Sequence, residues 1–110
     1  MPKRTVLGLL AASSAVLVGG SAAGADAAAG KKLAAQCAVC HGLDGIGRMP
    51  DVPNLAGEST IYLEKAIRDY RDGRREHEQM SIIAEALSDE EIADLAAWYA
   101  SLKVKVEMPP

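Results

Sequence analysis

The chain has 110 residues, enough for one domain, of which 49% are apolar and 25% charged. Aromatic residues make up only 4%, with one Trp, three Tyr and no Phe, so little material is available for a large self-sufficient core. Two cysteines exclude a scaffold built on several disulfides, and a net charge of −3 argues against nonspecific nucleic-acid binding, which needs clustered Lys and Arg.

The first 25 residues have the pattern of a secretory signal peptide. Lys3 and Arg4 precede an uncharged run with an apolar centre too short to span a bilayer comfortably. Small residues follow, and two A-x-A patterns offer cleavage after Ala25 or after Ala27. We expect cleavage near Ala25, which leaves residues 26–110 as a periplasmic domain with no membrane span; a retained N-terminal anchor is the alternative. Free thiols are unusual in that oxidising compartment, so the cysteines need a covalent partner.

The mature part begins with a helical pattern and continues into a loop. A narrow stripe of small residues at i, i+3, i+4 and i+7 predicts a helix over 27–37; its members are Gly30, Leu33, Ala34 and Cys37. Three glycines and two prolines then predict a loop over 42–53.

Two longer helices follow this loop. Ser59 is a predicted N-cap for a helix over 60–72, which Gly73 ends. A short helix is predicted over 82–87, and the capping box of Ser88 and Glu91 then opens a helix that ends near residue 102. Val104 and Val106 alternate with lysines in a short extended tail. We therefore expect an all-α fold of three main helices plus loops, too small to be stable without a large prosthetic group at its centre.

Residues 37–41 read Cys-Ala-Val-Cys-His, the C-x-x-C-H signature of covalent haem attachment. The thiols of Cys37 and Cys40 can add to the two vinyl groups of one porphyrin edge, and His41 then presents its imidazole to the iron. A thioredoxin-like disulfide would require a βαβ context, which the sequence lacks. A zinc site would need a fourth ligand besides two cysteines and a histidine, and a structural disulfide would close only four residues. We favour one haem c.

A second axial ligand must reach the iron from the opposite face. Met80 lies 39 residues after His41, far enough to wrap the ring, whereas Met49 follows after only eight residues in a turning segment. Met108 lies in a terminal tail that we expect to fray. His77 is a weaker candidate, because its neighbours Glu76 and Glu78 indicate a surface histidine. We expect His41 and Met80 to hold the iron.

Residues 30–102 resemble the small monohaem class I cytochromes c of bacteria. The resemblance covers nearly the whole predicted mature chain, and it is carried by Gly-Lys-Lys at 30–32, Cys-Ala-Val-Cys-His-Gly at 37–42, Pro-Asn-Leu-Ala-Gly at 53–57, Tyr-Leu at 62–63, Tyr-Arg-Asp-Gly-Arg-Arg at 70–75, Met80, and Leu-Ser-Asp-Glu-Glu-Ile-Ala-Asp-Leu-Ala-Ala-Trp-Tyr at 87–99. The family often has a proline soon after its axial methionine, whereas this chain continues with Ser-Ile-Ile at 81–83.

The resemblance implies roles for several further residues. The Pro53 carbonyl would accept the second N–H of the His41 imidazole, and Gly30 would meet Trp98 where the terminal helices cross. Leu33, Leu95 and Tyr99 would line that crossing. Tyr70 and Arg75 are candidates for contact with the haem or its propionates, whereas Arg71 and Arg74 are expected at a solvated helix end.

Methionine and histidine together leave no open position on the iron, so we expect an electron-transfer protein and not an enzyme. The predicted function is a periplasmic carrier that cycles between Fe(II) and Fe(III) and shuttles electrons between redox proteins. The donor and acceptor candidates are a flavoprotein, another dehydrogenase subunit or a terminal oxidase. Acidic residues at Glu85, Asp89, Glu90 and Asp94 either steer a basic partner or form a solvated helix face.

Two other functions stay open at this point. One is the haem subunit of a periplasmic dehydrogenase complex, such as a flavocytochrome c sulfide dehydrogenase. The other is a ligand-binding or peroxidatic haem protein in which Met80 can be displaced.

Overall fold

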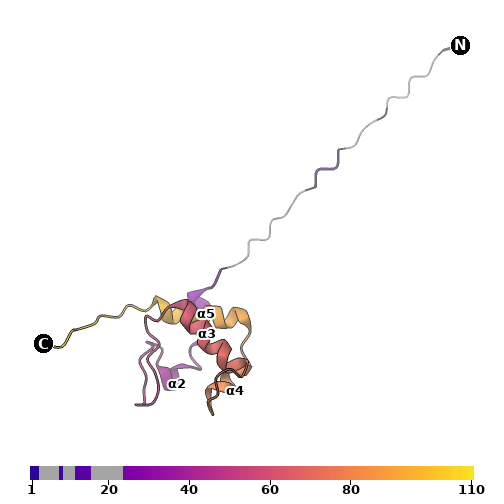
Figure 1. The fold of residues 1–110 in the computed structure, drawn as a ribbon. Coiled ribbons are helices and arrows are strands. Elements are labelled where there is room, and N and C mark those ends of the chain that lie inside the picture. Colours follow the sequence, from indigo (N-terminus) through magenta and orange to yellow (C-terminus); the bar gives the residue numbers. More distant parts are fainter. Residues whose placement is uncertain (3–7, 9–11, 16–23) are drawn as a thin grey trace.

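The structure is a computed structural model that describes residues 1–2, 8, 12–15 and 24–110. Most of the predicted signal peptide (3–7, 9–11 and 16–23) lies outside the described residues. The described part folds as helices without strands: α1 (Ala27–Leu33), α2 (Ala38–His41), α3 (Thr60–Arg71), α4 (Met80–Glu85) and α5 (Asp89–Ser101). None of these helices is long and apolar enough to cross a membrane. In Figure 1, α1 and α5 lie together, and α2 and α4 lie on the other side of α3.

The crossing of α1 and α5 depends on a glycine. A Cβ atom at Gly30 would lie 1.9 Å from the carbonyl oxygen of Asp94 and 3.0 Å from the Cβ of Trp98, so the two backbones can approach only without a side chain there. Asp26 caps α1, because its carboxylate accepts hydrogen bonds from the next helix amides. The Asp26 backbone N–H in turn donates to the Asp94 carboxylate over 2.7 Å, which ties the start of α1 to α5.

Both predicted helix caps of the second half are present. Ser59 accepts a hydrogen bond from the Tyr62 amide at the start of α3. At the start of α5, Ser88 accepts from the Glu91 amide, and the Glu91 carboxylate accepts from the Ser88 amide, so both halves of the capping box form. These caps fix where α3 and α5 begin.

The core of buried side chains is small. It contains Ala34, Leu63, Leu87, Ile92, Leu95, Ala96 and Tyr99. Among the described residues, Ile92 and Leu95 are the largest side chains that are essentially fully buried. This core lies where α5 packs against α1 and α3, and the predicted small-residue stripe of α1 contributes to it.

Two helix boundaries differ from the prediction. The first helix ends at Leu33 and not at Cys37, because the next turn tightens to i→i−3 hydrogen bonds, including Cys37 N–H to Ala34 O over 3.0 Å. A separate short helix, α2, then carries residues 38–41. The helix predicted over 82–87 lies two residues earlier in the structure: α4 begins at Met80, whose amide donates to the His77 imidazole.

The predicted loop over 42–53 folds back on itself. Gly42 and Gly45 have positive φ angles of 72° and 71°, which glycine adopts without strain. The Gly45 carbonyl accepts from the amides of Leu55 and Ala56, so the loop closes and returns the segment around Pro53 to α2.

Arg71 and Arg74 lie at the end of α3 as predicted, and Arg74 is exposed, but both also form ion pairs that the sequence did not indicate. Arg71 donates to the Asp89 carboxylate over 2.8 Å and thereby links α3 to α5. Arg74 donates over 2.7 Å to Asp69, a carboxylate that is only 6% exposed and also pairs with Lys65. Hydrogen bonds from Lys65 and then from Arg74 hold the pKa of Asp69 below its ordinary value. A nearly buried carboxylate recruits these cations because it needs partners.

Candidate haem site

One large cavity lies between α2, α3, α4 and the returning loop. Its volume is about 700 Å³, which is within the range of cofactor pockets. All seven predicted site residues line it: Cys37, Cys40, His41, Pro53, Tyr70, Arg75 and Met80. The aliphatic wall comes from core residues such as Leu63, Leu87 and Leu95. The fold therefore brings the whole predicted set to a single site.

The imidazole of His41 is held in one orientation. It is 8% exposed, and its Nδ1 lies 2.9 Å from the carbonyl oxygen of Pro53. With Nδ1–H donating to that carbonyl, the lone pair of Nε2 remains available to a metal. Arg48 N–H donates to the Cys40 carbonyl over 2.8 Å and anchors the helix that carries His41.

Two aromatic residues of α5 hold the chain immediately after the C-x-x-C-H segment. The Tyr99 hydroxyl donates to the Gly42 carbonyl over 3.2 Å, and the Trp98 indole N–H donates to the Leu43 carbonyl over 3.0 Å. Sequence reasoning assigned both rings to the helix crossing and missed these bonds. The available signal was chemical: a buried Tyr or Trp needs a partner for its polar atom.

The thiols of Cys37 and Cys40 are not joined in a disulfide. Both side chains are partly buried and line the cavity, where a bound ring can reach them. Burial raises the pKa of the Cys37 thiol. This arrangement fits covalent attachment of a cofactor better than a structural disulfide.

The methionines differ sharply in their placement. Met80 is the first residue of α4, is partly buried and lines the cavity. Met49 also lines the cavity but is 44% exposed. Met108 is 82% exposed in the tail and does not line it.

The loop that precedes Met80 also faces the cavity. The guanidinium of Arg75 lies 4.4 Å from the centre of the Tyr70 ring, and the ring of His77 meets Tyr70 edge-on at 6.4 Å. Exposed as predicted, His77 nevertheless lines the cavity and accepts hydrogen bonds from the Gln79 and Met80 amides. The polar neighbours of His77 concealed this contact in the sequence.

These residues fit a haem and do not fit the zinc alternative. The cavity combines two thiols, a buried imidazole with one nitrogen to spare, and a thioether, within aliphatic walls. Where the structure describes the chain, no three His, Cys, Asp or Glu side chains cluster closely enough to hold a metal ion. Thiolate and imidazole alone therefore cannot complete a four-ligand zinc site there.

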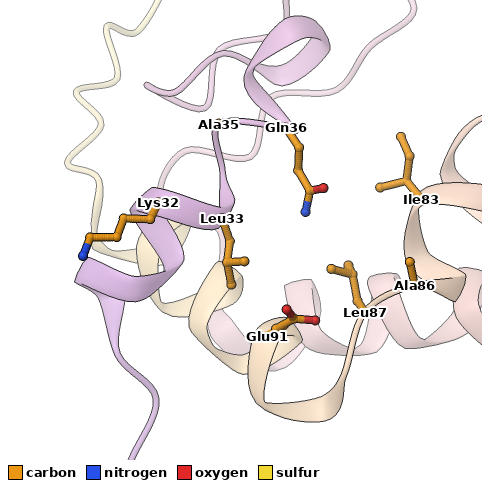
Figure 2. A pocket seen from close by; sticks show the side chains of 8 residues that line it. All are labelled: Lys32, Leu33, Ala35, Gln36, Ile83, Ala86, Leu87 and Glu91. Atoms are coloured by element: carbon orange, nitrogen blue, oxygen red, sulfur yellow. The ribbon is translucent and has the colours of Figure 1, made fainter.

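A smaller hollow of about 370 Å³ adjoins this cavity between α1, α4 and α5 (Figure 2). Gln36, Ile83 and Leu87 line both spaces, so the hollow and the cavity share a wall. In Figure 2, Gln36 projects into the opening opposite Ile83, and Leu33 and Leu87 form its floor near Glu91.

Comparison with known proteins agrees with this site. The cytochrome c family matches residues 27–103. Cytochrome c-554(548) of Halomonas halodenitrificans is 51% identical over 79 residues, which cover 69% of this chain and 95% of that protein. A thiosulfate dehydrogenase electron acceptor of Thiomonas intermedia is 40% identical over 83 residues, covering 74% of this chain and 38% of that protein.

The crystal structure of reduced recombinant cytochrome c4 from Pseudomonas stutzeri is similar to this fold, with a TM-score of 0.69 and 35% sequence identity. The match covers 74% of this chain and 48% of that one, so the chain spans about half of that protein.

The fold and the site together define a small all-α protein built around a c-type haem. The chain belongs to the cytochrome c family. It is an electron-transfer protein with redox partners, and it carries one haem c, bound covalently through Cys37 and Cys40.

Proposed function

We propose that the chain is a periplasmic one-electron carrier in which His41 and Met80 are the axial ligands. The observation that carries this proposal is the convergence of Met80 and the oriented His41 on the cavity that both cysteines line. When bound, haem with this ligand pair supplies an iron centre of raised potential that accepts and releases one electron.

The protein's own contribution is to hold the two ligands and exclude substrates. The hydrogen bond to the Pro53 carbonyl fixes the His41 ring and makes its other nitrogen a better donor. Met80 offers a neutral thioether from the segment that begins α4. If both side chains held the haem iron, no coordination position would remain for a substrate, which argues against an enzyme.

Tyr70 and Arg75 have a proposed role at the polar side of the site. Both line the cavity, and the stacked guanidinium keeps the Arg75 charge beside the Tyr70 ring. A guanidinium is suited to a carboxylate, because its donors match both oxygens. We assign to Arg75 the contact with a haem propionate, with Tyr70 as the surface that orients it.

We propose that the signal peptide is cleaved after Ala25. A cut after Ala27 would remove Asp26, which caps α1 and contacts Asp94. A cut after Ala25 instead makes Asp26 the first residue, and its new α-amino group lies where the Asp26 amide is now, 2.7 Å from the Asp94 carboxylate. The mature domain, residues 26–110, would then begin with an ion pair between its two terminal helices.

Partners are proposed to dock briefly where residues that line the cavity are also exposed at the surface. Met49 and Ile83 line the cavity and stay 44% and 37% exposed, which gives its edge an apolar component. Small, partly apolar contacts are typical of transient redox encounters. Two of the acidic residues considered for steering, Asp89 and Asp94, are already engaged within the fold, which favours an apolar over an acidic docking contact.

A second candidate function is electron acceptance from a dehydrogenase within a complex. It is favoured by the similarity to the thiosulfate dehydrogenase electron acceptor of Thiomonas intermedia. Gel filtration after gentle purification separates the two functions. A monomer supports the free carrier, and a stable heterodimer with a flavoprotein or another dehydrogenase subunit supports the complex.

The axial ligation is tested by visible spectra of the purified protein in both oxidation states. We expect a weak methionine-to-iron charge-transfer band near the red edge of the oxidised spectrum, and Met80→Ala should abolish it. Two matched controls are available. Met49→Ala removes a cavity methionine and Met108→Ala removes a tail methionine, and both should keep the band.

Three outcomes would contradict the proposed ligation. Persistence of the band in Met80→Ala with loss in Met49→Ala would transfer the ligand role to Met49. Loss in Met108→Ala would transfer it to the tail. Carbon monoxide binding to the reduced wild-type protein at neutral pH would favour a ligand-binding or peroxidatic haem protein.

A further inference from the structure

The segment that leads into α4 is held by an unusual acceptor. The residue before the helix, Gln79, makes no side-chain cap. Instead, Nδ1 of His77 accepts hydrogen bonds from the backbone N–H groups of Gln79 over 3.2 Å and Met80 over 3.3 Å. The first amides of a helix have no hydrogen-bond partner within the helix. Here an imidazole accepts from them, a role that Ser, Asp or Asn side chains usually have at helix N-caps.

A second pair of bonds closes the same segment. The backbone N–H of His77 donates to the Ser81 hydroxyl over 3.0 Å, and the backbone N–H of Ser81 donates to the His77 carbonyl over 3.1 Å. Together, four hydrogen bonds between residues 77 and 81 surround Met80. A proline at position 81 has no N–H and could not donate to the His77 carbonyl as Ser81 does.

The imidazole is itself oriented by its neighbours. Its ring meets Tyr70 edge-on, at an interplanar angle of 74°, and the Arg75 guanidinium also contacts the Tyr70 ring. The Arg75 amide donates to the Asp69 carbonyl at the end of α3 over 2.9 Å. The His77 ring is therefore tied to α3 on one side and to the Met80 backbone on the other.

We propose that His77 is a positioning residue for Met80: its Nδ1 fixes the backbone from which the thioether reaches the iron. This inference rests on the proposed ligation by Met80. His77 acts through the amides of Gln79 and Met80, with Ser81 completing the segment, and it does not bind the metal.

The test uses the complete haem-loaded protein and the His77→Ala variant. Without the two amide bonds, we expect the ratio of methionine-bound to methionine-free iron to fall about tenfold, the effect of losing roughly two ordinary hydrogen bonds. The readouts are a weaker charge-transfer band, a lower reduction potential and new carbon monoxide binding in the reduced form. Intact mass should still include the haem.

His77→Asn distinguishes positioning from general stabilisation. The Asn side-chain oxygen can accept from amides two and three residues further along the chain, as it does at helix N-caps. We expect this variant to restore the band and the potential nearly to wild-type values. Glu78→Ala, an exposed neighbour, serves as the matched control and should leave both unchanged.

Two results would overturn the inference: a wild-type band and potential in His77→Ala, or an Asn variant that loses the band as the Ala variant does. If His77→Ala does not accumulate as haem-loaded protein, His77→Asn is compared with wild type alone, and loss of its charge-transfer band overturns the inference. The Met80→Ala variant distinguishes a wrong role for His77 from a wrong assignment of Met80 as ligand. If that variant loses the band while His77→Ala keeps it, only the role of His77 is wrong.

Discussion

At the scale of single residues, Tyr99 joins α5 to the segment that carries the haem motif. Its ring is buried in the core, and its hydroxyl donates to the Gly42 carbonyl directly after His41. Burial raises the pKa of Tyr99 far above the ordinary value of a tyrosine. The hydroxyl therefore stays protonated, and remains a donor, at neutral pH.

Removal of this hydroxyl should weaken the fold without changing its shape. We expect Tyr99→Phe to lower the free energy of unfolding by about 1 kcal/mol, since the Gly42 carbonyl loses its donor. Denaturant titration of the haem-loaded protein measures this change. Tyr62→Phe is a suitable control, because that ring is half exposed and its hydroxyl makes no hydrogen bond within the described part of the chain. Equal stability of Tyr99→Phe and wild type would show that the bond contributes nothing.

Single residues also show where sequence reasoning works and where it stops. Cys37, Cys40 and His41 could be predicted because one local motif contains them and its spacing follows from the chemistry of attachment. His77 could not, because its acceptor role depends on how the loop before α4 folds. Its charged neighbours indicated only a surface position.

At the scale of elements, the contact between α1 and α5 limits what the sequence can tolerate. We expect Gly30→Ala to destabilise the protein by about 1–3 kcal/mol or more, because the new methyl group would overlap the Asp94 carbonyl and force the helices apart. Thermal unfolding of the haem-loaded variant measures the loss. Ala28→Leu adds more volume at an exposed position of the same helix and should have little effect. Similar melting of Gly30→Ala and wild type would mean that α1 can shift freely.

The ion pairs of α3 give stability a defined dependence on pH. Lys65 and Arg74 lower the pKa of Asp69 in the folded protein. The ion pairs therefore contribute their full stabilisation above the unfolded pKa of about 3.9, and this stabilisation is lost as the pH falls through the lower folded pKa. We expect the stability difference between wild type and Asp69→Asn to be full at neutral pH and to shrink below about pH 4. Melting curves from neutral to acidic pH measure it. A difference that does not change with pH would contradict the pairing.

Element boundaries were predictable where the signal was local. The caps at Ser59 and Ser88 lie three residues from the amides they bind, so the starts of α3 and α5 follow from the sequence. The break after Leu33 and the early start of α4 do not. They depend on a tightened turn and on the His77 imidazole, an acceptor from the preceding loop, and hydrophobic periodicity carries no information about either.

At the scale of the whole molecule, the described residues are arranged around the haem cavity more than around the apolar core. The core has few large side chains, whereas the cavity of about 700 Å³ is lined by parts of four helices and the returning loop. The low aromatic content pointed to this shortage, and the need for a central group followed from it. The polypeptide is thus organised around its cofactor.

The most direct test of this account is the intact mass of the purified, exported protein, measured under denaturing conditions. We predict a single species with the mass of residues 26–110 plus one haem, which survives because the thioethers to Cys37 and Cys40 are covalent. A soluble, folded protein with the mass of the bare polypeptide would contradict the account.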